Sequence, residues 1–268
     1  MRNDRLFTFL QDKIWAIHPP KLEEIELAVD RIMMGERSFD LNLKGRSGNR
    51  ASDRFEITKD GIAILPVMGV IDRKANLFTE FSGGTSIDIL QQDFDEAIDD
   101  PEVKGIFFDG DTPGGDAQGP QDFAHRIFEA RGKKPTVAFT DGMVASAGYW
   151  ILSAADELVG TSMSEWGSIG VAAVHYDRSE KDKMWGIKRT DITAGKYKRI
   201  TSDAQPLTEE GKAYIQEQVD YVYTEFIDSV AKNLGVDSDA VLKMADGKIF
   251  MGKKAKNIGL IHVLCPLS

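Results

Sequence analysis

The sequence predicts one large α/β domain in which a twisted, mainly parallel sheet is surrounded by helices, with an N-terminal arm ahead of it. Short apolar runs typical of buried strands recur from residue 61 onward, and segments with hydrophobic residues at helical spacing lie between them. Strands that alternate with helices of this length are joined by crossover connections, which produce a parallel sheet covered on both faces. The chain has 268 residues, 42% of them hydrophobic, which is enough for a substantial core.

Residues 1–60 are predicted to form the arm, and residues 61–268 the main domain. Within the arm, residues 22–33 carry apolar side chains at helical spacing and are predicted to be helical. Residues 35–56 are polar and contain glycine. That composition predicts a mobile segment.

The first half of the main domain reads as alternating strands and helices. The apolar run 61–71 contains Pro66, which predicts either two strands or one strand near a sheet edge. The elements expected after it are a helix at 87–100, a strand at 103–111, a loop through "TPGGDAQG", a helix at 120–132, a strand at 135–141, a helix opening at Ser146, and strands in "ELVGT" and "SIGVAAVHYD".

The second half is predicted to contain an extended piece, "IKRTDITAGKY", and then a long helix. Thr208 is the expected N-cap of this helix, two glutamates follow in its first turn, and Gly235 ends it. The C-terminal "DGKIFMGKKAKNIGLIHVL" suggests a short helix and a final strand.

Composition narrows the function. A net charge of -10 argues against a nucleic-acid or anionic-membrane surface. Cys265 is the only cysteine, so no intrachain disulfide is possible, which fits a reducing compartment. We find no secretory signal and no apolar run of roughly 20 residues, the length a membrane span requires. We therefore expect a soluble, cytoplasmic protein.

Two loops follow consecutive parallel strands, at the edge of the sheet where ligands bind in open α/β folds. The first, "TPGGD" (112–116), contains Gly114 and Gly115, whose backbone amides can approach a ligand closely. The second, "GMVASAG" (142–148), places Ser146 at the start of a helix, with the amide of Ala147 next to it. A serine there is commonly a helix cap, but the two loops together also suit a nucleophile beside an oxyanion hole.

A serine nucleophile needs a base, and the residues alone leave several open. The chain has four histidines, of which His175 is the one that a Ser–His pair would use. The segment "AGKYKRITSD" offers Lys196 and Lys198 instead. Ser–Lys pairs perform the same acyl chemistry when the lysine is neutral. Both lysines share a face in an extended chain, so spacing does not choose between them.

Several stretches match one family in order. The segments "GDTPGGDAQG", "VASAGYWILSAADELVGTSMSEWGSIGV" and "TAGKYKRITSDAQPLTEEGKAYIQEQVDYVYTEFIDSVAKN" resemble the signal peptide peptidase A family of serine–lysine peptidases. They look most like its tailed-phage members, the head (capsid) maturation proteases. The resemblance covers roughly residues 60–265, so it identifies the main domain as a peptidase domain.

The resemblance implies a role for each matching residue. It makes Ser146 the nucleophile and Lys198 the general base, and it places oxyanion donors at Gly114 or Gly115 and at Ala147. Ser168, in "GSIGV", matches a position whose hydroxyl orients the lysine. No metal or cofactor is expected.

The resemblance also implies a fold and an assembly. The fold is the one shared by the Clp protease subunit and the crotonases. Members form homo-oligomeric rings, and in short members the serine and lysine can come from neighbouring subunits. The expected substrates are proteins or peptides, with capsid, scaffold, portal or the chain itself as candidates.

The sequence departs from the family in two places. Ala147-Gly148 stands where many members have Gly-Gly. Trp166 stands where a small residue is common, which suggests either a narrowed substrate pocket or a subunit contact.

Other functions compete with phage procapsid maturation. They are a soluble bacterial enzyme that degrades peptides, an acyl-CoA enzyme of the crotonase type with Asp116 as its carboxylate, and a catalytically silent structural member.

Overall fold

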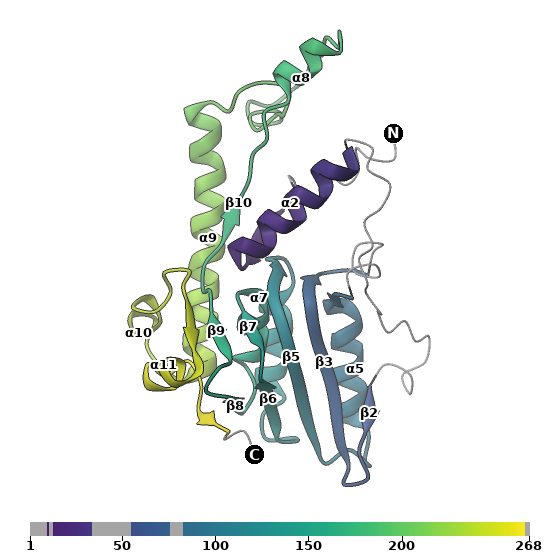
Figure 1. Cartoon of the computed structure of the whole chain (residues 1–268), viewed down its shortest axis with the longest axis vertical. Helices are drawn as coiled ribbons and strands as arrows, with labels where there is room; N and C mark the ends of the chain where they lie inside the picture. The colour runs from purple at the N-terminus through teal and green to yellow at the C-terminus, as the bar shows by residue number, and fades with distance from the viewer. Residues whose placement is uncertain (1–9, 11–12, 34–54, 76–82, 266–268) are drawn as a thin grey trace.

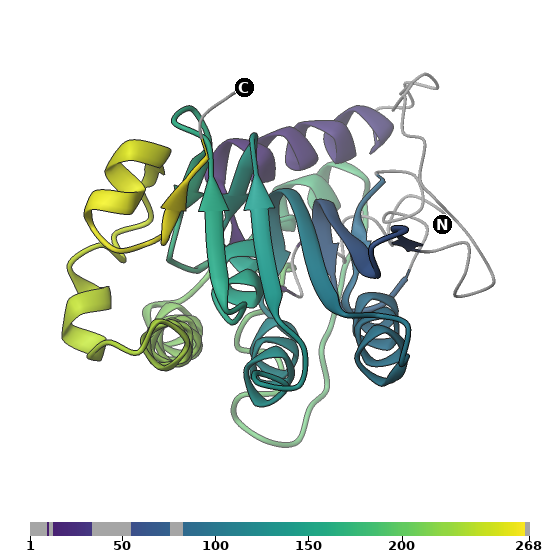
Figure 2. The same cartoon turned by 90° about the horizontal axis from the view of Figure 1, so that it is seen from below.

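The computed structural model describes residues 10, 13–33, 55–75 and 83–265 (Figure 1). Its strands form a twisted, mainly parallel sheet with helices packed around it, which confirms the predicted fold class (Figures 1 and 2). The pairs β3–β5, β5–β6, β6–β8 and β8–β12 are parallel, as are β5–β7 and β7–β9. The pairs of β1 with β5 and β10, of β2 with β3, and of β9 with β11 are antiparallel.

The strands have the following bounds: β1 (Ile14–Ile17), β2 (Glu56–Ile57), β3 (Ile62–Asp72), β4 (Thr85–Ser86), β5 (Gly105–Asp116), β6 (Thr136–Thr140), β7 (Met143–Ala145), β8 (Glu157–Gly160), β9 (Glu165–Gly167), β10 (Ala172–Ala173), β11 (Ile249–Met251) and β12 (Val263–Leu264). The helices are α2 (Pro19–Met33), α5 (Ile87–Asp99), α6 (Pro120–Glu129), α7 (Ala147–Leu152), α8 (Ser179–Met184), α9 (Glu209–Leu234), α10 (Ser238–Leu242) and α11 (Gly252–Asn257).

Helices cover both sides of the sheet. In Figure 2, α5, α6 and α9 are seen end-on along one face, and α2 lies across the opposite side. The main core lies between the sheet and its helices, and its largest buried side chains include Trp150, Trp166, Phe108 and Phe226. Trp166 packs edge-on against Tyr149 at 6.4 Å and is fully buried inside its own chain, so it lies neither in an open pocket nor on the surface.

The strand that contains Pro66 is a single strand near the sheet edge. On one side β3 pairs along its length with β5. On the other side β2 pairs with Ala63 and Ile64, and β4 with Ile71 and Asp72. Pro66 falls between these two short pairings, where its missing N–H breaks no ladder among the described strands.

The "TPGGD" segment is a strand rather than the predicted loop. It forms the second half of β5, because Gly114–Asp116 pair with β1, and Gly114 and Gly115 also pair with β3. The partner β1 lies about a hundred residues earlier in the chain, which no local pattern in the sequence indicates.

The N-terminal region contributes both a strand and a helix. Residues Ile14–Ile17 join the sheet as β1, and α2 covers the predicted helix at 22–33. The predicted mobile segment falls almost entirely within 34–54, outside the described residues. The division into an arm and a peptidase domain at residue 60 stays a prediction.

The long helix has the predicted caps. The Thr208 side chain accepts a hydrogen bond from the Gly211 amide at 3.0 Å, and Gly235 ends α9 with φ 67°. The upper part of α9, together with α8 and the segment that joins them, projects beyond the sheet (Figure 1). Among the described residues, no helix combines the length and hydropathy that a membrane-spanning segment requires.

Candidate active site

Ser146 lies at a sharp turn between a strand and a helix. It directly follows β7 and is the N-cap of α7, with φ 52° and ψ -117°. This backbone conformation is strained for any residue except glycine and costs on the order of 1–3 kcal/mol. The Ser146 hydroxyl does not cap the helix; it donates to the Gly170 carbonyl at 3.4 Å. The turn therefore differs from an ordinary helix cap, in which the hydroxyl accepts a hydrogen bond from an amide of the first helical turn.

Ser168 lies beside Ser146. The parallel strands β7 and β9 pair Ala145 with Gly167, so each serine is the next residue after this pair. The Ser146 amide donates to the Gly167 carbonyl at 2.8 Å. Ser168 has φ 50°, and these two serines are the only non-glycine residues with positive φ in the described part of the chain. Both strained positions are thus predicted site residues.

Gly114 contacts the start of α7. A Cβ at Gly114 would lie 2.9 Å from the Ser146 Cβ and 3.0 Å from the Ala147 nitrogen, and its φ is +94°. Only glycine fits there. Gly115 lies in the ladder between β1 and β3. The structure therefore brings Gly114, Ser146 and Ala147 together, with Gly115 one residue further along the strand.

Thr112 is a buried residue of this site that the sequence did not single out. Its Oγ1 donates to the Gly69 carbonyl at 2.6 Å and accepts from the Gly114 amide at 3.1 Å. The hydroxyl thereby fixes the backbone of the glycine that faces Ser146. A polar residue directly before Pro-Gly-Gly was the signal available in the sequence.

Lys198 does not lie next to Ser146 within the chain. It is exposed, in the segment that joins α8 to α9. Its neighbours tie this segment to the start of α9: Lys196 forms an ion pair with Glu210, and the Tyr197 ring stacks on Tyr214 at 5.4 Å.

The length of α9 gives an estimate of the distance between Ser146 and Lys198. Glu210 lies in the first turn of this helix, and Phe226 stacks on Trp150 of α7 with ring centroids 4.3 Å apart. At 1.5 Å per residue, about 24 Å of helix separates Glu210 from Phe226. Lys198 is near the first of these points and Ser146 near the second, so they lie on the order of 20 Å apart in one chain.

The two lysines differ in their surroundings. The hydrogen bond that Lys196 donates to the Glu210 carboxylate, together with the negative charge of that group, raises the pKa of Lys196 above its ordinary value. A general base must be neutral, so this contact works against Lys196.

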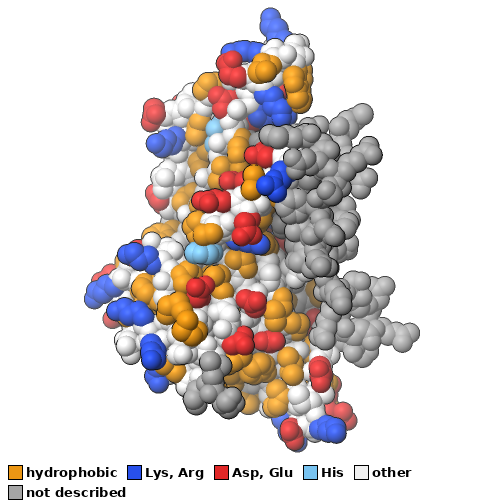
Figure 3. Space-filling model, in the orientation of Figure 1, with side chains coloured by type: hydrophobic (Ala, Val, Ile, Leu, Met, Phe, Trp, Pro, Cys, Tyr) orange, Lys and Arg blue, Asp and Glu red, His pale blue; other side chains and the backbone are white. Residues whose placement is uncertain are grey.

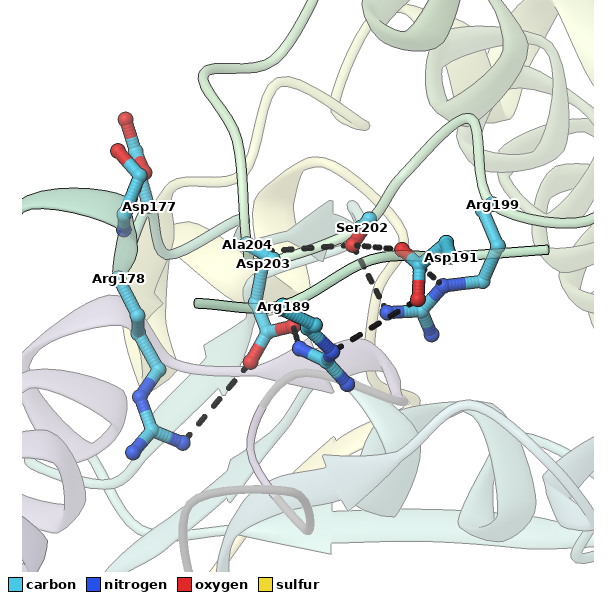
Figure 4. A network of polar contacts seen from close by, with 9 residues as sticks. Asp177, Arg178, Arg189, Asp191, Arg199, Ser202, Asp203 and Ala204 are labelled. Carbon is cyan, nitrogen blue, oxygen red and sulfur yellow. Dashed lines mark hydrogen bonds and ion pairs between the residues drawn. The ribbon is translucent and has the colours of Figure 1, made fainter. Parts of the chain in front are cut away.

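A polar network fixes the backbone next to Lys198 (Figure 4). Arg199 donates to Asp191 at 3.0 Å and to the Ser202 hydroxyl at 2.8 Å. Arg189 donates to Asp203 at 2.8 Å. These contacts hold residues 189–191 against residues 199–203 within the segment that joins α8 to α9, so this segment has a defined shape although it lacks regular secondary structure.

The histidines are not paired with Ser146. Nε2 of His175 has no hydrogen-bond partner among the described residues. His262 accepts from the Leu158 amide at 3.0 Å, and His125 is exposed between Lys232 and Glu129.

Asp116 forms an ion pair with Lys13. It is buried, and its carboxylate accepts from Lys13 at 2.7 Å and from the Gln118 amide at 2.9 Å. That pairing does not suit a free catalytic carboxylate of an acyl-CoA enzyme. Within the described ranges, no group of three His, Cys, Asp or Glu side chains is arranged to hold a metal ion.

The fold and this turn define a class of protein: an α/β chain with a serine held in a strained strand-to-helix turn beside a glycine-rich strand. A model of peptidase family S49 matches residues 129–265, just over half of the chain. The chain belongs to peptidase family S49.

The chain is also similar in sequence to individual proteins that are named as proteases. The chain is 37% identical to "Putative protease MJ0651" of Methanocaldococcus jannaschii over 169 residues, which cover 62% of this chain and 54% of that protein. It is 29% identical to "Capsid assembly protease C" of Escherichia phage lambda over 235 residues, covering 88% and 53%. The chain thus spans about half the length of these curated relatives.

Among solved structures, a mutant of the membrane-bound stomatin-specific protease 1510-N aligns with a TM-score of 0.47 at 16% identity, covering 78% of this chain and 81% of that one.

Proposed function

We propose that this protein is a serine endopeptidase in which Ser146 is the nucleophile and Lys198 the general base. The observation that carries the proposal is the strained turn at Ser146, next to the equally strained Ser168. Backbone strain of this kind persists where the surrounding structure enforces it, and it gathers at functional sites. Membership of peptidase family S49 supports the same chemistry.

Each residue has a defined step in this mechanism. The neutral Lys198 amine takes the proton of the Ser146 hydroxyl as its oxygen attacks the substrate carbonyl carbon. The Ala147 amide and the Gly114–Gly115 backbone stabilise the resulting oxyanion. Lys198 then returns the proton to the leaving amine, and water hydrolyses the acyl-enzyme. The Ser168 hydroxyl orients the lysine.

Lys198 reaches Ser146 from a neighbouring subunit in this proposal. It belongs to the segment that joins α8 to α9, which projects beyond the sheet (Figure 1), and it is on the order of 20 Å from the serine of its own chain. Hydrophobic side chains lie exposed on the same projection (Figure 3). They include Met184, Trp185, Ile187 and Ile192, of which Ile192 is 94% exposed. An apolar surface of this kind suits a contact between copies in a closed ring.

We further propose that the enzyme acts in phage procapsid maturation, on scaffold, portal or its own chain, in the host cytoplasm or the procapsid interior. The similarity to the capsid assembly protease of phage lambda supports this role. Genes for portal and capsid beside the gene for this chain would agree with it, whereas their absence favours a soluble bacterial peptide-degrading enzyme.

The first experiment is a time course with an unfolded test protein between pH 6 and pH 10, read by mass spectrometry. Ser146→Ala and Lys198→Ala should both abolish cleavage, and the matched control Lys196→Ala should retain it. The rate should rise as the lysine deprotonates. Full cleavage by Ser146→Ala would refute the proposal. Intact assembly of phage heads by Ser146→Ala would instead indicate a structural role.

A mixing experiment tests the shared site. Ser146→Ala and Lys198→Ala chains, inactive alone, should regain activity when they are mixed and reassembled. A site built from two subunits gives about a quarter of the sites both intact residues in an equal mixture. No recovery in a mixture shown to contain both chains would place both residues in one subunit.

A further inference from the structure

The strand β1 lies between two elements of the candidate active site. It pairs antiparallel with Gly114–Asp116 of β5 on one side and with Ala172–Ala173 of β10 on the other. β10 is four residues beyond Ser168, and Gly114 faces Ser146. The backbone of the chain's own residues 14–17 therefore fills the space between the glycine strand and the segment that follows Ser168.

The register between β1 and β5 places β1 close to Ser146. The position of a Cβ on Gly114 is 2.3 Å from the Ala16 carbonyl oxygen, and the same point is 2.9 Å from the Ser146 Cβ. Ile17 is paired with Gly114. An extended peptide that adds a strand to this edge of β5 would use the same row of backbone groups.

Ser146 is fully buried in this structure. A nucleophile that attacks a peptide bond in another protein must be reachable, so an element that covers it must move. The Ala16 carbonyl of β1 lies against Gly114, the glycine that contacts Ser146, so β1 is among the elements next to the nucleophile.

β1 packs in two cores: Ala16 belongs to the main core, and Trp15 and Ile17 belong to a smaller one. Trp15 and Ile17 pack in a hydrophobic cluster separate from the main core, together with Leu22, Ile25 and Val29 of α2 and with Val70. Lys13 anchors the strand by ion pairs with Asp72 at 2.5 Å and Asp116 at 2.7 Å. A satellite cluster of this kind can open locally while the main core stays folded.

We propose that β1 is an intramolecular occupant of the peptide-binding groove: residues 14–17 lie where an extended segment of a protein substrate must bind, and β1 with α2 blocks the site until displaced. This inference rests on the proposed function, because it takes Ser146 to be the nucleophile. The groove then accepts extended segments with a small side chain at the position of Ala16, which packs in the main core.

A reversible disulfide tests the blockade. Ile14 and Ala173 are paired across antiparallel strands, a spacing that a disulfide can bridge. We would introduce Ile14→Cys and Ala173→Cys in a Cys265→Ser background, with Glu56→Cys and Ile64→Cys, paired across β2 and β3, as the matched control. Oxidation should slow cleavage of an unfolded test protein at least about tenfold, and reduction should restore it. Equal rates in both redox states would overturn the proposal.

A binding assay separates this proposal from the proposed catalysis. The same disulfide variant, carrying Ser146→Ala and Trp15→Ala to loosen β1, is titrated into a labelled peptide of residues 13–19 and followed by fluorescence anisotropy. The reduced protein should bind the peptide and the oxidised protein should not. This result supports occupancy of the groove even when no form cleaves protein, whereas equal binding in both states, or none in either, refutes it. Where Trp15→Ala fails to fold, Lys13→Met replaces it, because it removes the ion pairs and keeps the apolar cluster.

Discussion

Gly148 of α7 lies directly against Thr112 of β5: a Cβ on Gly148 would be 2.3 Å from the Thr112 Cγ2 methyl. Thr112 in turn fixes the Gly114 backbone through its hydroxyl. The nucleophile helix and the glycine strand are thus in contact at a point where one added methyl group has no room. This contact accounts for the glycine two residues after Ser146.

Gly148→Ala should destabilise the fold and disturb the site. The added methyl forces Thr112 or α7 to shift, and overpacking of this kind typically costs about 1–3 kcal/mol. Chemical denaturation measures the loss. Gly170→Ala is the matched control, because its Cβ would meet only ordinary contacts at 3.6 and 3.9 Å. Equal stability of the two variants would show that the contact is not as tight as described.

Phe226→Ala should lower the free energy of unfolding by about 3–5 kcal/mol, as expected for a large aromatic residue removed from a core. Phe226 is fully buried and stacks on Trp150 with an interplanar angle of 6°. Phe226→Leu keeps part of the volume and should cost less. A loss below 1 kcal/mol for the alanine variant, roughly the cost of a surface substitution, would contradict this packing.

Asp109→Asn should stabilise the protein at neutral pH. Burial first, and then the charges of Asp141 and Asp111, raise the pKa of Asp109 above its ordinary value. A raised carboxyl pKa means that the folded state binds the proton more tightly than the unfolded state, so stability is lost as the pH rises through this range. The asparagine variant should therefore have a higher Tm at pH 7, and the difference should shrink below pH 4. A lower Tm of Asp109→Asn at pH 7 would show that burial and the neighbouring carboxylates do not make the Asp109 charge unfavourable in the folded state.

Arg199→Ala should reduce cleavage several-fold while it changes stability by less than about 1 kcal/mol, because its partners are partly exposed. Arg199 holds Asp191 and Ser202 next to Lys198. The control is Lys183→Ala, which removes an exposed ion pair with Glu180 on the same projection. Steady-state kinetics should show the loss in kcat for Arg199→Ala alone. Similar kinetics for both variants would show that Arg199 does not position Lys198.

The sequence predicted the alternation of strands and helices and the placement of Ser146 at a strand-to-helix turn, because both follow from local apolar patterns. It did not predict that "TPGGD" is a strand, since the partner strand β1 comes from a distant part of the chain. The four apolar residues of β1, which are followed by His18 and two prolines, were the available signal.

Spacing also left Lys196 and Lys198 equivalent. The contact that distinguishes them is with Glu210, beyond a loop whose path the sequence does not determine. Likewise, Trp166 looked like a pocket or interface residue, and only its packing against Tyr149 shows that it belongs to the core.

The position of Lys198, in the segment between α8 and α9 that projects beyond the sheet, has a consequence for regulation. Under the proposed shared site, an isolated chain holds a nucleophile without a base, and proteolysis begins only when copies meet. Dilution would then keep newly made enzyme silent, and crowding many copies into a small enclosed volume would switch it on. Local concentration would then set the time at which the reaction begins.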